Sequence, residues 1–367
     1  MGLPVGESDR KDRPTAIDLF CGCGGASLGL RAAGFDVIGA VDVDHLALKT
    51  YEANHPKVKT WPEDVRRLTV KSVMRELGIK RGQLGVLAGC PPCQGFSTMR
   101  TLNGSLVVED ERNDLVLAML RFVRVLRPKA VMMENVPRLA KDRRFRQFYA
   151  TLKKLGYDVN WAVLNARHYG VPQRRRRLLL LAGYGKSIDF APQDDTRVTV
   201  RDAIGDLPPA GHSGDPPHDL GEHRSERIRD LIAKIPRDGG SRTDLPDSDQ
   251  LPCHMKCDGF KDVYGRMAWD DVAPTITGGC FNPSKGRFLH PEKDRAITMR
   301  EAALLQSFPR TYSFPDCNSK CALALLIGNA LPPEFIRRHA LKIHACLRHE
   351  ACAEDNPAKG GIREGHA

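Results

Sequence analysis

The apolar run AIDLF at Ala16–Phe20 is followed at once by CGCGG at Cys21–Gly25, and these ten residues indicate the class of fold. A short apolar run of this kind is typical of a buried strand. The glycines after it allow a tight turn and a close approach of the backbone to a ligand. The small residues of Ala26–Ala33 then predict a helix whose N-terminus faces that ligand. A strand, a glycine-rich turn and a helix in this order predict the first unit of an α/β fold.

Similar apolar runs recur along the first half of the chain. They predict further strands at 35–41, 85–88, 130–133, 157–164 and 178–182, and helices at 45–54, 115–126 and 143–155. Strands that alternate with helices predict a doubly wound α/β fold with a mostly parallel sheet. In such sheets ligands bind beyond the carboxyl ends of the strands, where the glycine, cysteine and carboxylate clusters of this chain fall.

The pattern changes after the last of these strands. Residues 1–184 form the first predicted domain, and residues 185–296, rich in Pro, Gly, Asp and His, form a smaller loop-rich domain. Helical periodicity returns in 297–350, at 299–306, 322–327 and 334–347, with Thr298 as the predicted N-cap and Glu301 three residues later. The remainder, 351–367, is a polar tail.

The overall composition is that of an ordinary globular protein, with 41% hydrophobic and 28% charged residues. Lysine and arginine outnumber acidic residues by 56 to 45, and the net charge of +11 is compatible with a polyanionic partner. No apolar run approaches the roughly 20 residues of a bilayer span, and residues 1–14 lack the apolar core of a secretion signal. The eleven cysteines are unevenly spaced, so we expect free thiols and a cytoplasmic location.

The first candidate site is the glycine-rich turn itself. Gly22-x-Gly24 lacks the third glycine of a dinucleotide fingerprint, because Ser27 stands there, so the motif alone does not indicate NAD. Asp42 ends the second predicted strand about 20 residues on and is placed to bind ribose hydroxyls. Asp64 is placed to accept from an adenine amino group. The alternative is a tight turn with solvated loop acids.

The second candidate site is a CxxC motif, Cys90 and Cys93, in a loop that two prolines stiffen. A redox pair is one interpretation, and half of a zinc site with Cys253, His254 and Cys257 is another. A single reactive thiolate at the end of a strand fits better, because a nearby cation or helix N-terminus would activate it. The spacing does not decide which cysteine is used.

Two further clusters carry charge. Glu134 ends the strand predicted at 130–133, where a carboxylate is placed to share or donate a proton, or else to pair with a surface arginine. Four arginines, 174–177, precede the last strand. In a strand Arg175 and Arg177 share one face, so one alternating pair is expected to enter the cleft, unless the run is a solvated or phosphate-facing surface.

Together these motifs resemble those of the DNA (cytosine-5)-methyltransferase family. The matching motifs are, in the family's order, Asp18-Leu19-Phe20-x-Gly22-x-Gly24-Gly25, Gly89-x-Pro91-Pro92-Cys93-Gln94, Glu134-Asn135-Val136, Gln173-x-Arg175-x-Arg177, Arg300-Glu301-Ala302-Ala303-x-x-Gln306-x-Phe308-Pro309 and Gly328-Asn329-Ala330-x-Pro332. The resemblance covers residues 16–345, and 185–296 stands where the family has its variable target-recognition domain. The departures are mild: Cys21 and Cys23 flank Gly22, and Val43 replaces an aromatic or larger aliphatic residue.

The resemblance implies a Rossmann-like fold that uses S-adenosylmethionine, without a metal. It assigns Cys93, not Cys90, as the nucleophile, Glu134 as the group at cytosine N3, Arg175 as the contact to the ring carbonyl and Arg177 as its support. The residues that it implies for the cofactor are Asp18, Phe20, Gly22, Gly24, Asp42, Val43, Asp64, Pro92 and Asn329. Because Asn329 lies far along the chain, the C-terminal part is expected to pack back onto the first domain. The expected DNA contacts are Gln94, Ser97, Arg266 and Arg287.

The expected partner is double-stranded DNA, bound by a monomer that needs no membrane, acting alone or beside a restriction endonuclease with the same target site. Two alternatives remain at this point. A branch of the same family methylates tRNA, and a nucleic-acid-binding module with a decayed cofactor site is a different class of protein. The intact Cys93, Glu134 and Arg175 oppose the second alternative.

Overall fold

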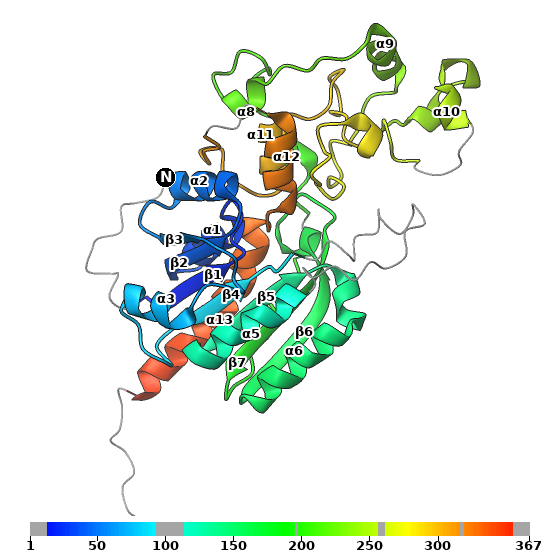
Figure 1. Cartoon of the computed structure of the whole chain (residues 1–367). Helices are drawn as coiled ribbons and strands as arrows, with labels where there is room; N and C mark the ends of the chain where they lie inside the picture. Colours follow the sequence, from blue (N-terminus) through cyan, green and yellow to red (C-terminus); the bar gives the residue numbers. More distant parts are fainter. Residues whose placement is uncertain (1–12, 93–113, 195–196, 256–260, 316–318, 355–367) are drawn as a thin grey trace, which may run out of the picture.

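A computed structural model describes residues 13–92, 114–194, 197–255, 261–315 and 319–354 of the 367-residue chain. In the described residues the strands form one seven-stranded sheet in the order β3-β2-β1-β4-β5-β7-β6 (Figure 1). Strand β7 is antiparallel to both of its neighbours, and the other adjacent strands are parallel. The prediction of a doubly wound, mostly parallel sheet is confirmed.

The elements of this sheet and its surroundings have the following bounds. The strands are β1 (Thr15–Leu19), β2 (Asp36–Asp42), β3 (Lys59–Pro62), β4 (Val86–Gly89), β5 (Ala130–Asn135), β6 (Tyr157–Asn165) and β7 (Arg176–Tyr184). The helices are α1 (Gly25–Ala32), α2 (His45–Asn54), α3 (Val70–Leu77), α5 (Leu115–Leu126), α6 (Arg143–Lys154), α7 (Val200–Ile204), α8 (Pro216–Asp219), α9 (Glu226–Lys234), α10 (Pro252–Met255), α11 (Met299–Leu305), α12 (Lys320–Asn329) and α13 (Pro333–Glu354). Short 3-10 helices are η4 (Pro137–Lys141), η5 (Ala166–Tyr169), η6 (Arg242–Asp244), η7 (Asp247–Asp249) and η8 (Pro283–Lys285).

Every strand predicted from the sequence is present to within two residues, but β3 and α3 were missed. Strand β3 has the sequence KTWP and lies at the edge of the sheet, where only Trp61 is buried. A single buried residue leaves no alternating pattern to detect. Helix α3 is a two-turn element that buries Val70 and Val73 and ends at the left-handed Gly78.

Two helical layers cover the sheet. Helix α5 contacts both α3 and α6, and the core beneath these helices contains residues of β1, β4, β5 and β7. A separate core holds α1 and α13 together. Their approach is close, because a Cβ added at Gly29 of α1 would lie 2.5 Å from the carbonyl oxygen of Pro333. The C-terminal helix therefore does pack back onto the first part of the chain, as Figure 1 shows.

The loop-rich segment lies farther from the sheet than the helices α11 and α12 that follow it in the sequence. Figure 1 shows α8, α9 and α10 far from the sheet, with α11 and α12 between them and the strand ends. Helices α11 and α12 share a core with residues of 200–297, together with Cys23 and Ala47. Helices α11 and α12 thus contact both the loop-rich segment and, through Cys23 and Ala47, the first part of the chain, and α13 then packs against α1.

None of the helices in the described ranges is long and apolar enough to cross a bilayer.

Candidate active site

A cavity of about 980 Å³ opens at the carboxyl ends of β1, β2, β4 and β5. The predicted site residues that line it are Phe20, Gly22, Asp42, Val43, Asp64, Pro92, Glu134, Arg175, Arg177 and Asn329. Residues expected for a cofactor and residues expected for catalysis therefore share one space, at the edge of the sheet where α/β proteins bind ligands.

The turn after β1 shapes one wall of this cavity. The backbone has φ of 61° at Phe20, 54° at Gly22 and 95° at Gly24. The Gly22 amide donates to Asp42 Oδ2 at 2.8 Å, and a Cβ added at Gly22 would meet no atom within 4 Å, so the loop is open on the cavity side. At Gly24 an added Cβ would lie 2.7 Å from the Tyr312 hydroxyl, so this glycine serves the packing beneath the loop.

Asp18 also lies beneath the loop. Its side chain is 1% exposed and accepts a hydrogen bond from Ser27 Oγ at 2.8 Å, and this hydroxyl lies 2.7 Å from that of Tyr51. Burial raises the pKa of Asp18 to about 7, although the bond from Ser27 acts in the opposite direction. The carboxyl group of Asp18 supports the loop from below and is not among the residues that line the cavity, and its contact with a cofactor stays a prediction.

The far end of the cavity combines acids with apolar surface. Asp42 ends β2 half-buried, and burial raises its pKa. Val43 is 61% exposed beside it. Asp64 pairs with Arg66 at 2.6 Å, and this hydrogen bonding lowers the pKa of Asp64. Arg66 lines the same cavity and was missed, although a cation two residues after a candidate acid was a usable signal. Asn329 reaches the cavity from the end of α12.

Glu134 lies at the other end of the cavity, near the end of β5. Its carboxylate is 2% exposed, with Oε1 at 2.9 Å from Arg177 Nε. The Cys90 thiol donates to Oε2 at 2.8 Å. Burial, and after it the negative charge of Glu134, raise the pKa of Cys90 well above its usual range, so this thiol stays protonated. Cys90 therefore lacks the thiolate that a nucleophile requires.

Arg175 has a different environment from Arg177, although both line the cavity. Its guanidinium is 3% exposed and donates to the backbone carbonyls of Ile276, Gly328 and Ala330 at 3.0, 3.1 and 3.2 Å. Burial and the nearby Arg177 lower the pKa of Arg175 to about 9, which still leaves it charged at neutral pH. Arg177 thus contacts the Glu134 carboxylate, whereas Arg175 joins distant segments.

Gln173, like Arg175, bonds to segments that are distant in the sequence. Its amide nitrogen donates to the carbonyl of Leu305 and to Gln306 Oε1, and its oxygen accepts from the Ile276 amide at 2.8 Å. Gln306 in turn donates to the Ile327 carbonyl at 2.7 Å. The two glutamines are fully buried, so these bonds fix the start of β7 against α11 and α12.

The loop-rich segment uses its two candidate arginines internally. Arg266 is 0% exposed, so the predicted DNA contact of this residue is corrected. Its guanidinium donates to the carbonyls of Ile232, Ile235, His290 and Lys293 and pairs with Asp294. Arg287 is half-buried, and its Nη1 donates to three backbone carbonyls, that of Arg266 among them. Both side chains hold the loops of this segment together.

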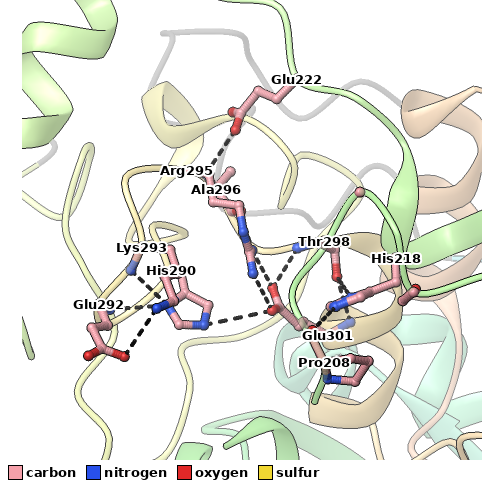
Figure 2. Close-up of polar contacts among 12 residues, drawn as sticks. Pro208, His218, Glu222, His290, Glu292, Lys293, Arg295, Ala296, Thr298 and Glu301 are labelled. Atoms are coloured by element: carbon pink, nitrogen blue, oxygen red, sulfur yellow. Dashed lines mark hydrogen bonds and ion pairs between the residues drawn. The ribbon is translucent and has the colours of Figure 1, made fainter. Parts of the chain in front are cut away.

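A second polar cluster at the start of α11 was only partly predicted. The capping box of Thr298 and Glu301 is confirmed. Glu301 also accepts two hydrogen bonds from Arg295 (Figure 2). The ring of His218 lies 2.8 Å from the Thr298 hydroxyl. Burial raises the pKa of Glu301, but the bonds from Arg295 outweigh it and the net pKa is lowered. The cluster attaches the loop-rich segment to α11.

Three predicted residues, Cys93, Gln94 and Ser97, lie outside the described residues. The chain leads to them through Pro91 and Pro92, and Pro92 lines the cavity. Asn135 fixes this approach by donating to the Pro91 carbonyl at 2.9 Å. The loop that carries Cys93 therefore starts at the cavity wall next to the end of β5.

A mostly parallel sheet with one reversed strand, a glycine turn and a cavity at the strand ends define a methyltransferase fold of the S-adenosylmethionine-dependent type. The chain belongs to the family of C-5 cytosine-specific DNA methylases, whose sequence model matches residues 15–345. It is thus a DNA cytosine-5 methyltransferase.

Relatives and solved structures agree with this assignment. The chain is 38% identical over 338 residues to the Type II methylase M.HgiDII of Herpetosiphon aurantiacus, covering 86% of this chain and 91% of that protein. It is 34% identical to the Type II methyltransferase M.XorII of Xanthomonas oryzae pv. oryzae, covering 92% and 86%. A solved prophage-encoded protein of E. coli shares the fold, with a TM-score of 0.71, 24% identity and coverage of 91% and 99%.

The different environments of the two arginines predict different effects of the same substitution. Arg175→Lys should lower the free energy of unfolding by about 2 kcal/mol, because one ammonium group cannot serve three carbonyls arranged around a planar guanidinium. Arg177→Lys keeps a cation beside Glu134, so stability should change by less than about 1 kcal/mol while methyl transfer slows. Denaturant titrations and initial rates on duplex DNA measure both. If Arg175→Lys has the same free energy of unfolding as the wild type, Arg175 does not hold these segments together.

Asp18 predicts a specific pH dependence of stability. Because folding raises its pKa from 3.8 to about 7, its contribution to stability is full below pH 4 and is lost as the pH rises towards 7. Asp18→Asn should remove this loss, worth about 1.4 kcal/mol per pKa unit. The measurement compares unfolding free energies of the two proteins at pH 5 and pH 8, with the half-exposed Asp158→Asn as control. If the stability of Asp18→Asn depends on pH as that of the wild type does, the pKa of Asp18 is not raised by burial.

Proposed function

We propose that this enzyme transfers a methyl group from S-adenosylmethionine to carbon 5 of a flipped-out cytosine in a specific duplex DNA sequence, through a covalent adduct with Cys93. The observation that carries the proposal is the shared cavity. It joins the glycine turn and Asp42 to the buried pair of Glu134 and Arg177, and it meets the start of the Cys93 loop.

The chemistry explains why these groups are needed together. Carbon 5 of cytosine is a poor nucleophile, and addition of a thiolate at carbon 6 makes the ring electron-rich enough to attack a methyl group. Loss of the carbon-5 proton and elimination of the thiolate then release 5-methylcytosine. The ring is unreachable inside a duplex, so the base must leave the stack and enter the cavity.

The residues at the first strand ends fit a nucleoside with a charged, flexible tail. Gly22 leaves open space, Asp42 presents a carboxylate to hydroxyl groups, and the exposed Val43 offers apolar surface to a flat ring. Asp64, with Arg66, is placed at the edge of that ring, and Asn329 closes the site from α12. Bound there, S-adenosylmethionine supplies the electrophilic methyl group.

Glu134 and Arg177 bind the reacting ring. The buried carboxylate holds the N3 edge of cytosine and shares a proton with it as the ring gains electrons. Arg177, and not Arg175 as the sequence suggested, lies beside that carboxylate and contacts the ring carbonyl oxygen, where negative charge develops. Arg175 instead keeps the cavity wall in place through its three backbone carbonyls.

The remaining chain serves target recognition. We assign the loop-rich segment 185–296, with α11 and α12 as its base, to the second wall of a DNA cleft, and Gln94 and Ser97 to contacts near the flipped base. The Type II names of the relatives favour a restriction-modification setting, in which a monomer works on the DNA of its cell beside an endonuclease with the same target.

The covalent step predicts a trapped complex. Bisulfite sequencing of DNA from cells that express the protein identifies the target, and a duplex with that target and 5-fluorocytosine at the methylated position should then form an irreversible adduct. The adduct should map to Cys93, because fluorine blocks the loss that releases the enzyme. Cys93→Ser should abolish methyl transfer while donor binding, measured by calorimetry, survives.

The matched control is Cys321→Ala, which removes an exposed thiol outside the cavity lining and should leave adduct formation unchanged. An adduct on any peptide other than that of Cys93 contradicts the proposed nucleophile. Methylation of tRNA but not of duplex DNA contradicts the proposed substrate.

A further inference from the structure

Among the described residues, Cys90 is the thiol that lies against the carboxylate of Glu134. Strands β4 and β5 are parallel with Gly89 opposite Met133, so Cys90, the first residue after β4, lies beside Glu134 of β5. The thiol donates to Glu134 Oε2 at 2.8 Å, and both groups line the cavity. The contact thus follows from the register of the sheet and does not depend on a loop conformation.

The position of this thiol is fixed on both sides. The Cys90 amide donates to the Leu19 carbonyl at 3.3 Å, and its side chain packs against the core beneath α1 and α13. One residue further, Pro91 accepts from Asn135 at 2.9 Å. Cys90 is therefore held to the ends of β1 and β5 at once, which leaves its side chain little freedom to turn away from Glu134.

The carboxylate of Glu134 has two different partners among the described residues. The Cys90 thiol donates a hydrogen bond to Oε2 at 2.8 Å, whereas Arg177 Nε forms an ion pair with Oε1 at 2.9 Å without hydrogen-bond geometry. The lone pairs of the buried Oε1 are therefore left for a bound ring. With the thiol donor removed, the carboxylate is free to rotate about its last side-chain bond, and Oε1 is no longer held in one direction.

We propose that Cys90 is a positioning residue of the methyl-transfer reaction, whose thiol holds Glu134 in the orientation that binds the N3 edge of cytosine. The inference rests on the proposed function and assigns a second role within the CxxC motif. Cys93 acts as the nucleophile, and Cys90 acts through Glu134 as a neutral donor. The raised pKa of the Cys90 thiol agrees with this role, because a thiolate at Oε2 would repel the carboxylate.

The test compares Cys90→Ala, which removes the donor, with Cys90→Ser, which keeps one. On the duplex target, Cys90→Ala should lower kcat about tenfold, the factor that corresponds to one hydrogen bond to a charged group. The KM values for the donor and for DNA should stay within about twofold, because neither ligand binds mainly through Glu134. Cys90→Ser should recover most of kcat. A loss of fold would instead lower the melting temperature and affect both variants.

A double-mutant cycle separates positioning from general damage to the site. In a Glu134→Gln background the Cys90→Ala substitution should have almost no further effect on kcat, since the carboxylate that it orients is gone. Cys346→Ala is the matched thiol control, because Cys346 lies on α13 and bonds to the Ser187 carbonyl. It should behave as wild type throughout.

The possible results distinguish this inference from the proposed function. A wild-type enzyme that does not methylate the duplex refutes the proposed function itself. An active wild type with an unchanged kcat in Cys90→Ala, or equal losses in the presence and absence of Glu134, refutes the role of Cys90 alone.

Discussion

The buried guanidinium of Arg175 is the constraint on which the arrangement of the active site depends. A cation taken out of water is costly unless hydrogen-bond acceptors replace the water, and here three backbone carbonyls do so. Two of them, those of Gly328 and Ala330, belong to the C-terminal end of α12, which carries a partial negative charge. The third, that of Ile276, belongs to the loop-rich segment. Arg175 thus holds together the start of β7, the loop at Ile276 and the end of α12. Gln173 and Gln306 add further hydrogen bonds between the same parts of the chain.

The reversal of β7 then explains how the pair of Glu134 and Arg177 forms. The other strands of the sheet deliver residues to the cavity from their carboxyl ends, but an antiparallel strand begins at that edge. Because Asn135 lies opposite Leu178, the preceding Arg177 lies beside the end of β5 and reaches Glu134. The register of β4 with β5 places Cys90 on the other side of the same carboxylate. Sheet topology therefore orients the reactive carboxylate from two directions.

The sequence predicted most of the fold and the members of the site, but not every role. Strands in the interior of the sheet have continuous apolar runs, whereas the edge strand β3 buries only Trp61. Arg175 and Arg177 share one face of a strand by alternation, so local pattern could not show which would meet backbone carbonyls contributed by residues about 100 and 150 positions later. Likewise Asp18 belongs to a cofactor motif, yet its burial depends on Ser27 and Tyr51, which the motif does not include.

The fate of the arginines also changes how the net charge of +11 should be interpreted. Arg266 and Arg300 are buried with their guanidinium groups bonded to carbonyls and to Asp294 or Asp215, and Arg295 is committed to Glu301. In the described part of the loop-rich segment, ladder pairing is limited to isolated bridges such as that of Arg266 with Leu289, and planar guanidinium groups with five donors satisfy other backbone carbonyls. Some of the positively charged side chains therefore serve to hold loops together. DNA contacts should be sought among the exposed lysines and arginines.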